Sequence, residues 1–307
     1  MSGSKGVSKG AAAAGLQRFG VVSDEIHDDP DVAFRVANEL GMGHVDLNSV
    51  WGKTVTELTP AEVAEVRRLL DRYGLEVRLV AGLAFKTFIV AGKPKEELLG
   101  SSEFEEHMAM LRRSVEIAKE LGAPLVRVHA CRWPHMKGFG NPSPRYPDGG
   151  TIPPGELDLI VAVLRAACRL AEEHDVLLGL ENVRSCYANS GRNTGLIVDA
   201  VGDERLKVVW DPANAYVSGE ARPYPGGFEA VREHLAHFHA KDARVVDPET
   251  GLTAWECIGA GEVEYDDQLR ALAAFPDVGI TLETHWRGPG LTPEASSRES
   301  FRALLEV

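Results

Sequence analysis

Residues 177–182 read LLGLEN, an apolar run that ends in polar side chains. A short run rich in Leu, Val or Ile is typical of a strand buried in a parallel sheet. The pattern recurs three times in the second half of the chain, in VVWDPAN (208–214), HFHAKD (237–242) and ITLETHW (280–286). Apolar runs separated by helix-length segments predict parallel strands with helices between them.

Four more strand-like runs precede these, at 19–26, 44–51, 76–82 and 125–131. The stretches between runs carry helix boundary signals, such as Thr59-Pro60 at one start and Gly74 at the following end. Eight alternations without a Gly-x-Gly-x-x-Gly fingerprint favour a closed barrel over a doubly wound, dinucleotide-binding sheet. We therefore predict an α/β fold, a single (β/α)8 TIM barrel over residues 18–307.

The first 17 residues, MSGSKGVSKGAAAAGLQ, are small and polar. Their composition predicts a disordered tail over residues 1–17, because it offers little apolar surface to bury. Four alanines do not make the apolar core of a secretory signal, and no segment approaches the ~18 apolar residues of a membrane span. We expect a cytoplasmic protein with no membrane partner.

The overall charge and the cysteines narrow the classes of partner. A formal net charge of −13 argues against a surface that binds nucleic acid, where a basic stripe is expected. The four cysteines are scattered and form no CxxC pair, which fits free thiols in a reducing compartment.

A long loop follows the fourth strand-like run, RWPHMKGFGNPSPRYPDGG at 132–150, and a second long loop is expected at 244–263. Structureless loops of this length in compact domains are usually functional or disordered. We predict a loop that covers the substrate, with a plain surface insertion as the alternative. The aromatic and basic residues that favour the first interpretation are Trp133, His135, Lys137, Arg145 and Tyr146.

Each of the four C-terminal runs has one ligand-type side chain near its carboxyl end. These are Glu181, Asp211, His239 and Glu283, at spacings of 30, 28 and 44 residues. Each spacing fits about one strand–helix–strand unit, so the four side chains are expected on the rim where α/β barrels keep their active sites. Singly, each could be a salt-bridge partner, a turn residue or a structural histidine, but their shared position favours one site.

The four residues together predict a metal site. Two Glu, one Asp and one His form an oxygen and nitrogen ligand set without sulfur, which suits Mn²⁺, Mg²⁺, Co²⁺ or Zn²⁺. Three carboxylates that converge without a cation would repel and raise each other's pKa. A divalent ion would remove that conflict.

The segments LEN, WDPAN, HAKD and LETHW resemble those of the xylose isomerase-like barrel superfamily, often described as sugar phosphate isomerases and epimerases. The opening SDEI, the VWGK after the second run and the GAGEVEY before the last strand are similar to one subgroup, and the resemblance covers residues 19–307. In that superfamily the Glu, Asp, His and Glu of strands five to eight bind one divalent metal. The matching His is two before the Lys of H-x-K-D, hence His239, with His237 as the alternative because it points the same way.

The resemblance implies proton transfer on a small carbohydrate, with Glu181 and Glu283 as the catalytic residues beside the reacting carbon. One divalent ion, Mn²⁺ first and Mg²⁺, Co²⁺ or Zn²⁺ otherwise, would polarise the carbonyl and stabilise an enediolate. A metal-dependent isomerase or epimerase of a sugar or a sugar phosphate is therefore expected. The alternative is a lyase or dehydratase acting on a keto-sugar or inosose, since both reactions begin with an enediolate. A non-catalytic sugar-binding protein is the third option.

Further residues near the strand ends are expected to bind substrate: Lys86, His129, Asn214, Lys241, Trp286 and Arg287. Each could instead be a solvated loop charge or a packing aromatic, and His285 could orient Glu283.

Two departures from the superfamily argue against specific branches. Ketose 3-epimerases carry a His and a Glu where this chain has Asn214 and Tyr187. The DNA-repair endonuclease branch needs histidines that VRLVAG (77–82) and DPAN (211–214) lack. The sequence leaves the substrate, the native metal and a homo-oligomeric state open.

Overall fold

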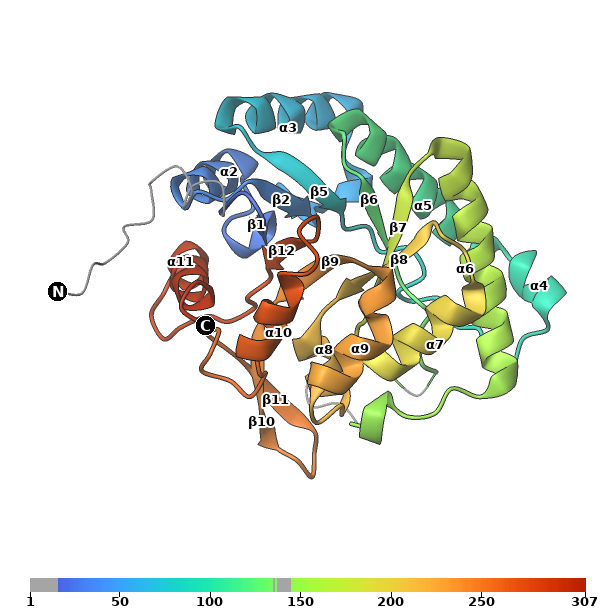
Figure 1. The fold of residues 1–307 in the computed structure, drawn as a ribbon. Coiled ribbons are helices and arrows are strands. Elements are labelled where there is room, and N and C mark those ends of the chain that lie inside the picture. Colours follow the sequence, from blue (N-terminus) through green and yellow to red (C-terminus); the bar gives the residue numbers. More distant parts are fainter. Residues whose placement is uncertain (1–15, 135, 137–144) are drawn as a thin grey trace.

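The computed structural model describes residues 16–134, 136 and 145–307. A closed parallel barrel forms the centre, with strands in the order β1-β12-β9-β8-β7-β6-β5-β2 and helices around the outside (Figure 1). This confirms the predicted (β/α)8 fold. The barrel strands are β1 (Phe19–Val22), β2 (His44–Leu47), β5 (Glu76–Val80), β6 (Leu125–Val128), β7 (Leu177–Glu181), β8 (Leu206–Trp210), β9 (Leu235–Ala240) and β12 (Gly279–Leu282). Residues 1–15 of the predicted tail, and His135 and Lys137 of the predicted covering loop, lie outside the described residues.

The outer layer consists of helices that begin and end largely where capping residues predict. Thr59 caps α3 (Pro60–Tyr73) through a capping box with Glu62, and Gly74 ends it in the left-handed conformation at φ 65°. In the described residues, no helix combines the length and apolar character needed to cross a bilayer. The other helices are α2 (Pro30–Glu39), α4 (Lys95–Leu99), α5 (Ser102–Leu121), α6 (Pro154–His174), α7 (Gly191–Val201), α8 (Pro212–Ser218), α9 (Phe228–Val231), α10 (Asp266–Leu272) and α11 (Pro293–Leu304).

Two regions differ from the sequence interpretation. The sixth strand ends at Trp210 rather than at 214, because Asp211 caps α8 and Pro212 occupies its first position. The segment 244–263, predicted as a loop, contains most of an antiparallel hairpin formed by β10 (Asp242–Asp247) and β11 (Leu252–Glu256). This hairpin projects beside the barrel (Figure 1). A shorter pair, β3 (Ser49–Val50) and β4 (Lys53–Thr54), follows β2.

The barrel interior is unusually polar. Barrel interiors are commonly filled by Val, Ile and Leu. Here a small apolar cluster, separate from the main hydrophobic core, consists of only Leu79, Ala81, Leu125 and Val209 among the described buried residues. Period-2 alternation continues inward from Leu125 and Val209 to charged residues at 127 and 211. The buried polar positions along the strands and their ends include His44, Asp46, Arg127, His129, Glu181, Asp211, His237, His239, Lys241, Thr281 and Glu283.

Glycines make room for two imidazoles at the amino-terminal end of the barrel. A Cβ on Gly20 would lie 2.3 Å from the His44 ring, and one on Gly279 would lie 2.9 Å from the His237 ring. Both distances are shorter than a real Cβ tolerates, so these positions require glycine while the histidines are present.

Candidate metal centre

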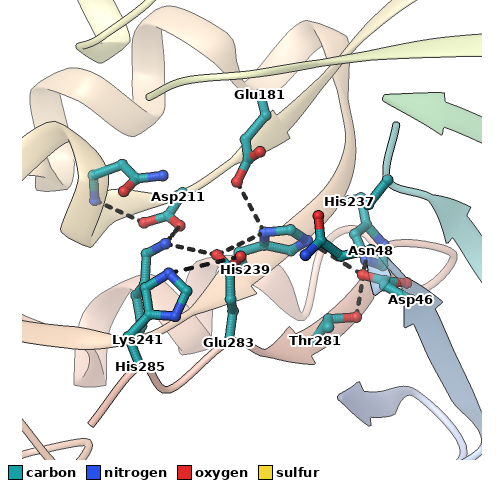
Figure 2. A network of polar contacts seen from close by, with 12 residues as sticks. Asp46, Asn48, Glu181, Asp211, His237, His239, Lys241, Thr281, Glu283 and His285 are labelled. Carbon is teal, nitrogen blue, oxygen red and sulfur yellow. Dashed lines mark hydrogen bonds and ion pairs between the residues drawn. The ribbon is translucent and has the colours of Figure 1, made fainter. Parts of the chain in front are cut away.

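The four predicted ligands converge at the carboxyl end of the barrel. Each offers an atom within 4.8 Å of the others, and all four are buried. Glu181 ends β7, Asp211 follows β8, His239 lies in β9 and Glu283 follows β12. Figure 2 shows the side chains pointing toward one another from separate strands. Neighbouring strands of the closed barrel thus bring together residues far apart in sequence.

His239, rather than His237, belongs to this cluster. Its Nδ1 lies 3.2 Å from Glu181 Oε1 and 3.4 Å from Glu283 Oε2. His237 instead lies deeper in the barrel, with its Nε2 2.7 Å from Asp46 Oδ2 and 2.9 Å from Thr281 Oγ1. Of the two histidines that the sequence left open, only His239 contacts the carboxylates at the rim.

Asp211 is held by the start of α8. Its Oδ1 accepts the backbone N–H of Asn214 at 2.7 Å. Asn182 accepts the backbone N–H of Asp211 at 2.8 Å and donates to its carbonyl at 2.7 Å, which joins the ends of β7 and β8. Asp211 Oδ2 makes no hydrogen bond although it is buried. The backbone therefore fixes one carboxylate oxygen and leaves the other directed at the cluster.

Two buried cations already lie among these carboxylates. Lys241 Nζ is 2.9 Å from Asp211 Oδ2 and 2.6 Å from Glu283 Oε2. Arg127 Nη1 is 3.0 Å from Glu181 Oε2. The sequence argument counted only the three carboxylates, whereas these two side chains supply part of the compensating charge.

Burial and neighbouring charges set the protonation of the cluster. Burial opposes ionisation of Glu181, but Arg127 and His239 outweigh it and hold the pKa of Glu181 below its ordinary value. Burial likewise opposes ionisation of Glu283, whose pKa is held well below the ordinary value chiefly by Lys241. Burial, helped by the two glutamates, raises the pKa of Asp211 to about 6 in spite of Lys241. Burial also opposes the charge on Lys241, but Asp211 and Glu283 raise its pKa, so Lys241 stays an ammonium.

The residues fit a divalent cation. Three carboxylates and one imidazole form a mixed oxygen and nitrogen donor set, which Mn²⁺, Mg²⁺, Co²⁺ and Zn²⁺ all accept. Asp211 Oδ2 accepts no backbone hydrogen bond, and its one contact is the ion pair with Lys241 at 2.9 Å. Such an ion would share Asp211 and Glu283 with the Lys241 ammonium.

Asp46 orients the imidazole of His239 through the ring nitrogen that faces away from Glu181 and Glu283. Asp46 is fully buried in β2, and its Oδ2 lies 3.2 Å from His239 Nε2 and 2.7 Å from His237 Nε2. A carboxylate on the second ring nitrogen fixes the orientation of a ligating histidine and directs its other nitrogen outward. Here that arrangement turns Nδ1 of His239 toward Glu181 and Glu283.

A pocket of about 180 Å³ opens above the cluster. Among the residues predicted to bind substrate, Lys86 and Asn214 line it, and so does His285. His129 and Lys241 lie among the buried side chains instead, and Trp286 and Arg287 are not in the lining of this pocket. The remaining lining residues are Met136, Val183, Arg184, Ser185, Val217 and Trp255.

His285 is fixed beside the cluster by Glu25. Its backbone has a φ of 48°, in the left-handed region that is unusual outside glycine. Its N–H donates to Glu25 Oε2 at 3.1 Å, its ring contacts the same carboxylate, and Arg287 Nη1 lies 3.0 Å from that carboxylate. His285 Nε2 is 3.9 Å from Glu283 Oε1, so the geometry is consistent with the expected orienting role.

His129 lies behind Glu181. Its Nδ1 is 3.2 Å from the carbonyl of Ala84, and its Nε2 is 3.8 Å from Glu181 Oε2. Burial, followed by Arg127 and Lys86, lowers the pKa of His129 well below its ordinary value. The imidazole is therefore neutral.

Residues 34–307 match the family described as xylose isomerase-like TIM barrel. The chain belongs to this family. No curated protein sequence matches the chain. The family match over residues 34–307 confirms the resemblance inferred from the strand-end motifs.

Several solved structures share the fold at low sequence identity. The IOLI protein with a bound zinc atom is 16% identical, with a TM-score of 0.70, covering 94% of this chain and 96% of that one. The E. coli 3-keto-D-glucoside 4-epimerase is 17% identical, with a TM-score of 0.65 and coverages of 95% and 100%. The probable 3-DHS dehydratase of Bacillus anthracis is 17% identical, with a TM-score of 0.63 and coverages of 87% and 90%. The structures similar to this member of the family therefore include an epimerase and a dehydratase.

Sequence reasoning missed several residues that shape this family member's site. Arg127 and Asp46 lie inside strands, where only a polar residue at every second position, as in His44-Val-Asp46, signals an inward direction. Trp255 lies on the hairpin that was taken for a loop. Arg184 follows Glu181 by three residues, and nothing local distinguishes it from an exposed loop charge.

Proposed function

We propose that this protein is a divalent-metal-dependent isomerase or epimerase that moves a proton on a small carbohydrate through an enediolate. The observation that supports the proposal is the convergence of Glu181, Asp211, His239 and Glu283 within 4.8 Å below an open pocket. Barrel active sites lie at this carboxyl rim. We propose Mn²⁺ as the first ion to test, with Mg²⁺, Co²⁺ and Zn²⁺ as alternatives.

The four ligand residues would hold the ion, which would supply positive charge to polarise a carbonyl and stabilise the oxygens of the enediolate. Glu181 and Glu283 are the proposed bases. Neighbouring cations keep the pKa of each below its ordinary value, so both are ionised at neutral pH and can accept a proton.

The pocket supports a small polar substrate. Lys86 and Asn214 line it, and both present groups that can hydrogen bond to sugar hydroxyls. Its volume of about 180 Å³ is below the ~300 Å³ at which pockets for drug-sized ligands begin.

Hydrogen exchange tests the proposal directly. The metal-loaded protein is incubated with a panel of ketoses and keto-inositols in D₂O, and deuterium on carbon is followed by mass spectrometry. Turnover in wild type is expected to disappear in Glu181→Gln and Glu283→Gln, with the fold retained by circular dichroism. Glu172→Gln, an exposed position on α6, is the matched control. Retention of most exchange in either site variant would refute the assignment.

A lyase or dehydratase on a keto-sugar or inosose is the second candidate. His285 lines the pocket and lies 3.9 Å from Glu283 Oε1, where a histidine could give a proton to a departing hydroxyl. The same incubation separates the two reactions. Loss of water gives an ultraviolet-absorbing enone, whereas isomerisation or epimerisation conserves mass apart from exchanged hydrogen.

A further inference from the structure

Arg184 is a half-buried cation that forms no ion pair with any described carboxylate. It lies in the connection between β7 and α7 and lines the pocket above the carboxylate cluster. Its Nη1 is buried and makes no hydrogen bond. Burial, followed by the positive charge of Arg145, lowers the pKa of Arg184, and no carboxylate contributes to the shift.

The residues that the structure does not describe cannot supply a carboxylate side chain for Arg184. Residues 1–15, 135 and 137–144 contain no Asp or Glu. No carboxylate side chain is therefore left to pair with Arg184 outside the residues that the structure describes. The lining of the pocket contains no Asp or Glu either, although the chain as a whole has 46 acidic and 33 basic residues.

Other cations lie on the same side of the site. Lys86 lines the pocket together with Arg184. Arg145 donates to the carbonyl of Tyr216 at 2.9 Å, and its guanidinium lies 5.4 Å from the centre of the Tyr216 ring. Arg145 Nε is also buried without a hydrogen bond. The lining of this pocket thus contains two cations, Lys86 and Arg184, which we call the basic wall, and Arg145 lies close to Arg184.

The basic wall adjoins the proposed catalytic cluster. Asn214 lines the pocket and donates its backbone N–H to Asp211 Oδ1 at 2.7 Å. His285 lines the pocket and reaches Glu283 Oε1 at 3.9 Å. The four cluster residues are not themselves in the lining, but Asn214 and His285 place the pocket directly beside them.

A buried guanidinium N–H group without an acceptor, such as Nη1 of Arg184, is costly unless a ligand supplies the acceptor. Planar arginine pairs with carboxylate or phosphate through two parallel hydrogen bonds. We propose that the substrate of this site carries an anionic group, a carboxylate or a phosphate, that pairs with Arg184. This inference rests on the proposed function for the reacting end of the molecule, and it deepens that function by assigning the substrate to the acidic or phosphorylated carbohydrates.

Three matched probes test the inference by binding, without relying on turnover. They are a neutral ketohexose, its 6-carboxylate and its 6-phosphate, namely D-fructose, D-fructuronate and D-fructose 6-phosphate. Their affinities for the full-length, Mn²⁺-treated protein are measured by isothermal titration calorimetry. The variants are Arg184→Gln, Arg184→Lys and the control Arg169→Gln, which removes the same charge from an exposed position on α6. Metal content is measured in each protein by elemental analysis.

At least one anionic probe is expected to bind wild type at least about tenfold more tightly than the neutral one, as for hydrogen bonds to charged groups. Arg184→Gln should lose that preference with unchanged affinity for the neutral probe and unchanged metal content. Arg184→Lys should keep part of the preference, and Arg169→Gln all of it. A preference between the two anionic probes identifies the group, and either answer supports the inference.

Equal affinity for all three probes, no binding of either anionic probe, or a preference that survives in Arg184→Gln would overturn the inference. The proposed function fails separately. If the protein retains no metal but Arg184 still selects the anionic probes, the function is wrong and the anion site stands. If carbon-bound hydrogen exchanges but the probes bind alike, the function stands and the anion site is wrong.

Discussion

Replacing Lys241 by Met is expected to destabilise the metal-free protein and to strengthen its binding of divalent ions. The ammonium lies 2.9 Å from Asp211 Oδ2 and 2.6 Å from Glu283 Oε2, and its side chain is 3% exposed. Methionine keeps much of the length of lysine and removes the charge. The two carboxylates then remain buried without the cation that lies between them.

The size of the effect follows from this burial. Removing one partner of a buried ion pair costs about 3–5 kcal/mol of unfolding free energy. With an unfolding entropy of about 2.1 cal/mol/K per residue, a chain of this length should lose about 5–8 °C in Tm. Because a divalent ion would compete with the ammonium for the same carboxylates, its affinity should rise at least about tenfold, or about 1.4 kcal/mol.

Thermal unfolding of chelator-dialysed protein measures the first effect, and calorimetric titration with MnCl₂ measures the second. Lys119→Met, at an exposed position on α5, is the control and should change stability by no more than about 0.5 kcal/mol. An unchanged Tm in Lys241→Met together with equal or weaker Mn²⁺ binding would refute the competition between lysine and metal.

Two other changes give distinct readouts. Asp46→Asn is expected to weaken Mn²⁺ binding about 10–100-fold, because Asp46 Oδ2 contacts His239 Nε2 and residues that orient a ligating histidine have effects of this size. Unchanged Mn²⁺ affinity in the calorimetric titration would contradict this prediction. Glu220→Gln is expected to stabilise the protein at pH 8 and to have little effect near pH 4. Burial raises the pKa of Glu220 from 4.5 to about 7. A carboxyl group whose pKa is higher in the folded state than in the unfolded state stabilises the fold at pH values below its ordinary pKa. That contribution is lost as the pH rises through 7, because the buried group must then ionise. At about 1.4 kcal/mol per pKa unit, the gain at pH 8 approaches about 3 kcal/mol, and urea unfolding that shows the same difference at both pH values would be inconsistent with it.

The sequence was sufficient for the barrel and for the four converging side chains because both depend on local patterns. Each ligand residue stands at the end of an apolar run, and parallel strands of one barrel end on one rim. The boundary at Asp211 was also readable, since Asp followed by Pro is a helix start. The sequence interpretation nevertheless placed residues 211–214 in the strand, because they directly follow the apolar residues of that run.

The partners of the cluster depend on closure of the barrel and were not readable. Asp46 contacts His239 across a separation of 193 residues, and Arg127 contacts Glu181 across 54. No local pattern states which inward side chains will meet across the interior. The absence of any carboxylate beside Arg184 is likewise a property of the assembled pocket, since acidic residues are abundant in the sequence.

The charges in the cluster favour a divalent ion even though lysine and arginine are present. Four buried carboxylates, counting Asp46, face Arg127, Lys241 and the imidazoles of His237 and His239. Carboxylates on both ring nitrogens raise the pKa of His239 well above its ordinary value, although burial opposes this. Arg127 and Lys241 supply two positive charges for four carboxylates, so neutrality requires two more charges from the imidazoles or from a bound cation, and buried unpaired charge costs several kcal/mol. A divalent ion that replaces the imidazole proton restores neutrality, because a ligating histidine must be deprotonated. The lysine therefore holds the carboxylates together without completing the charge balance, which leaves a driving force for metal uptake.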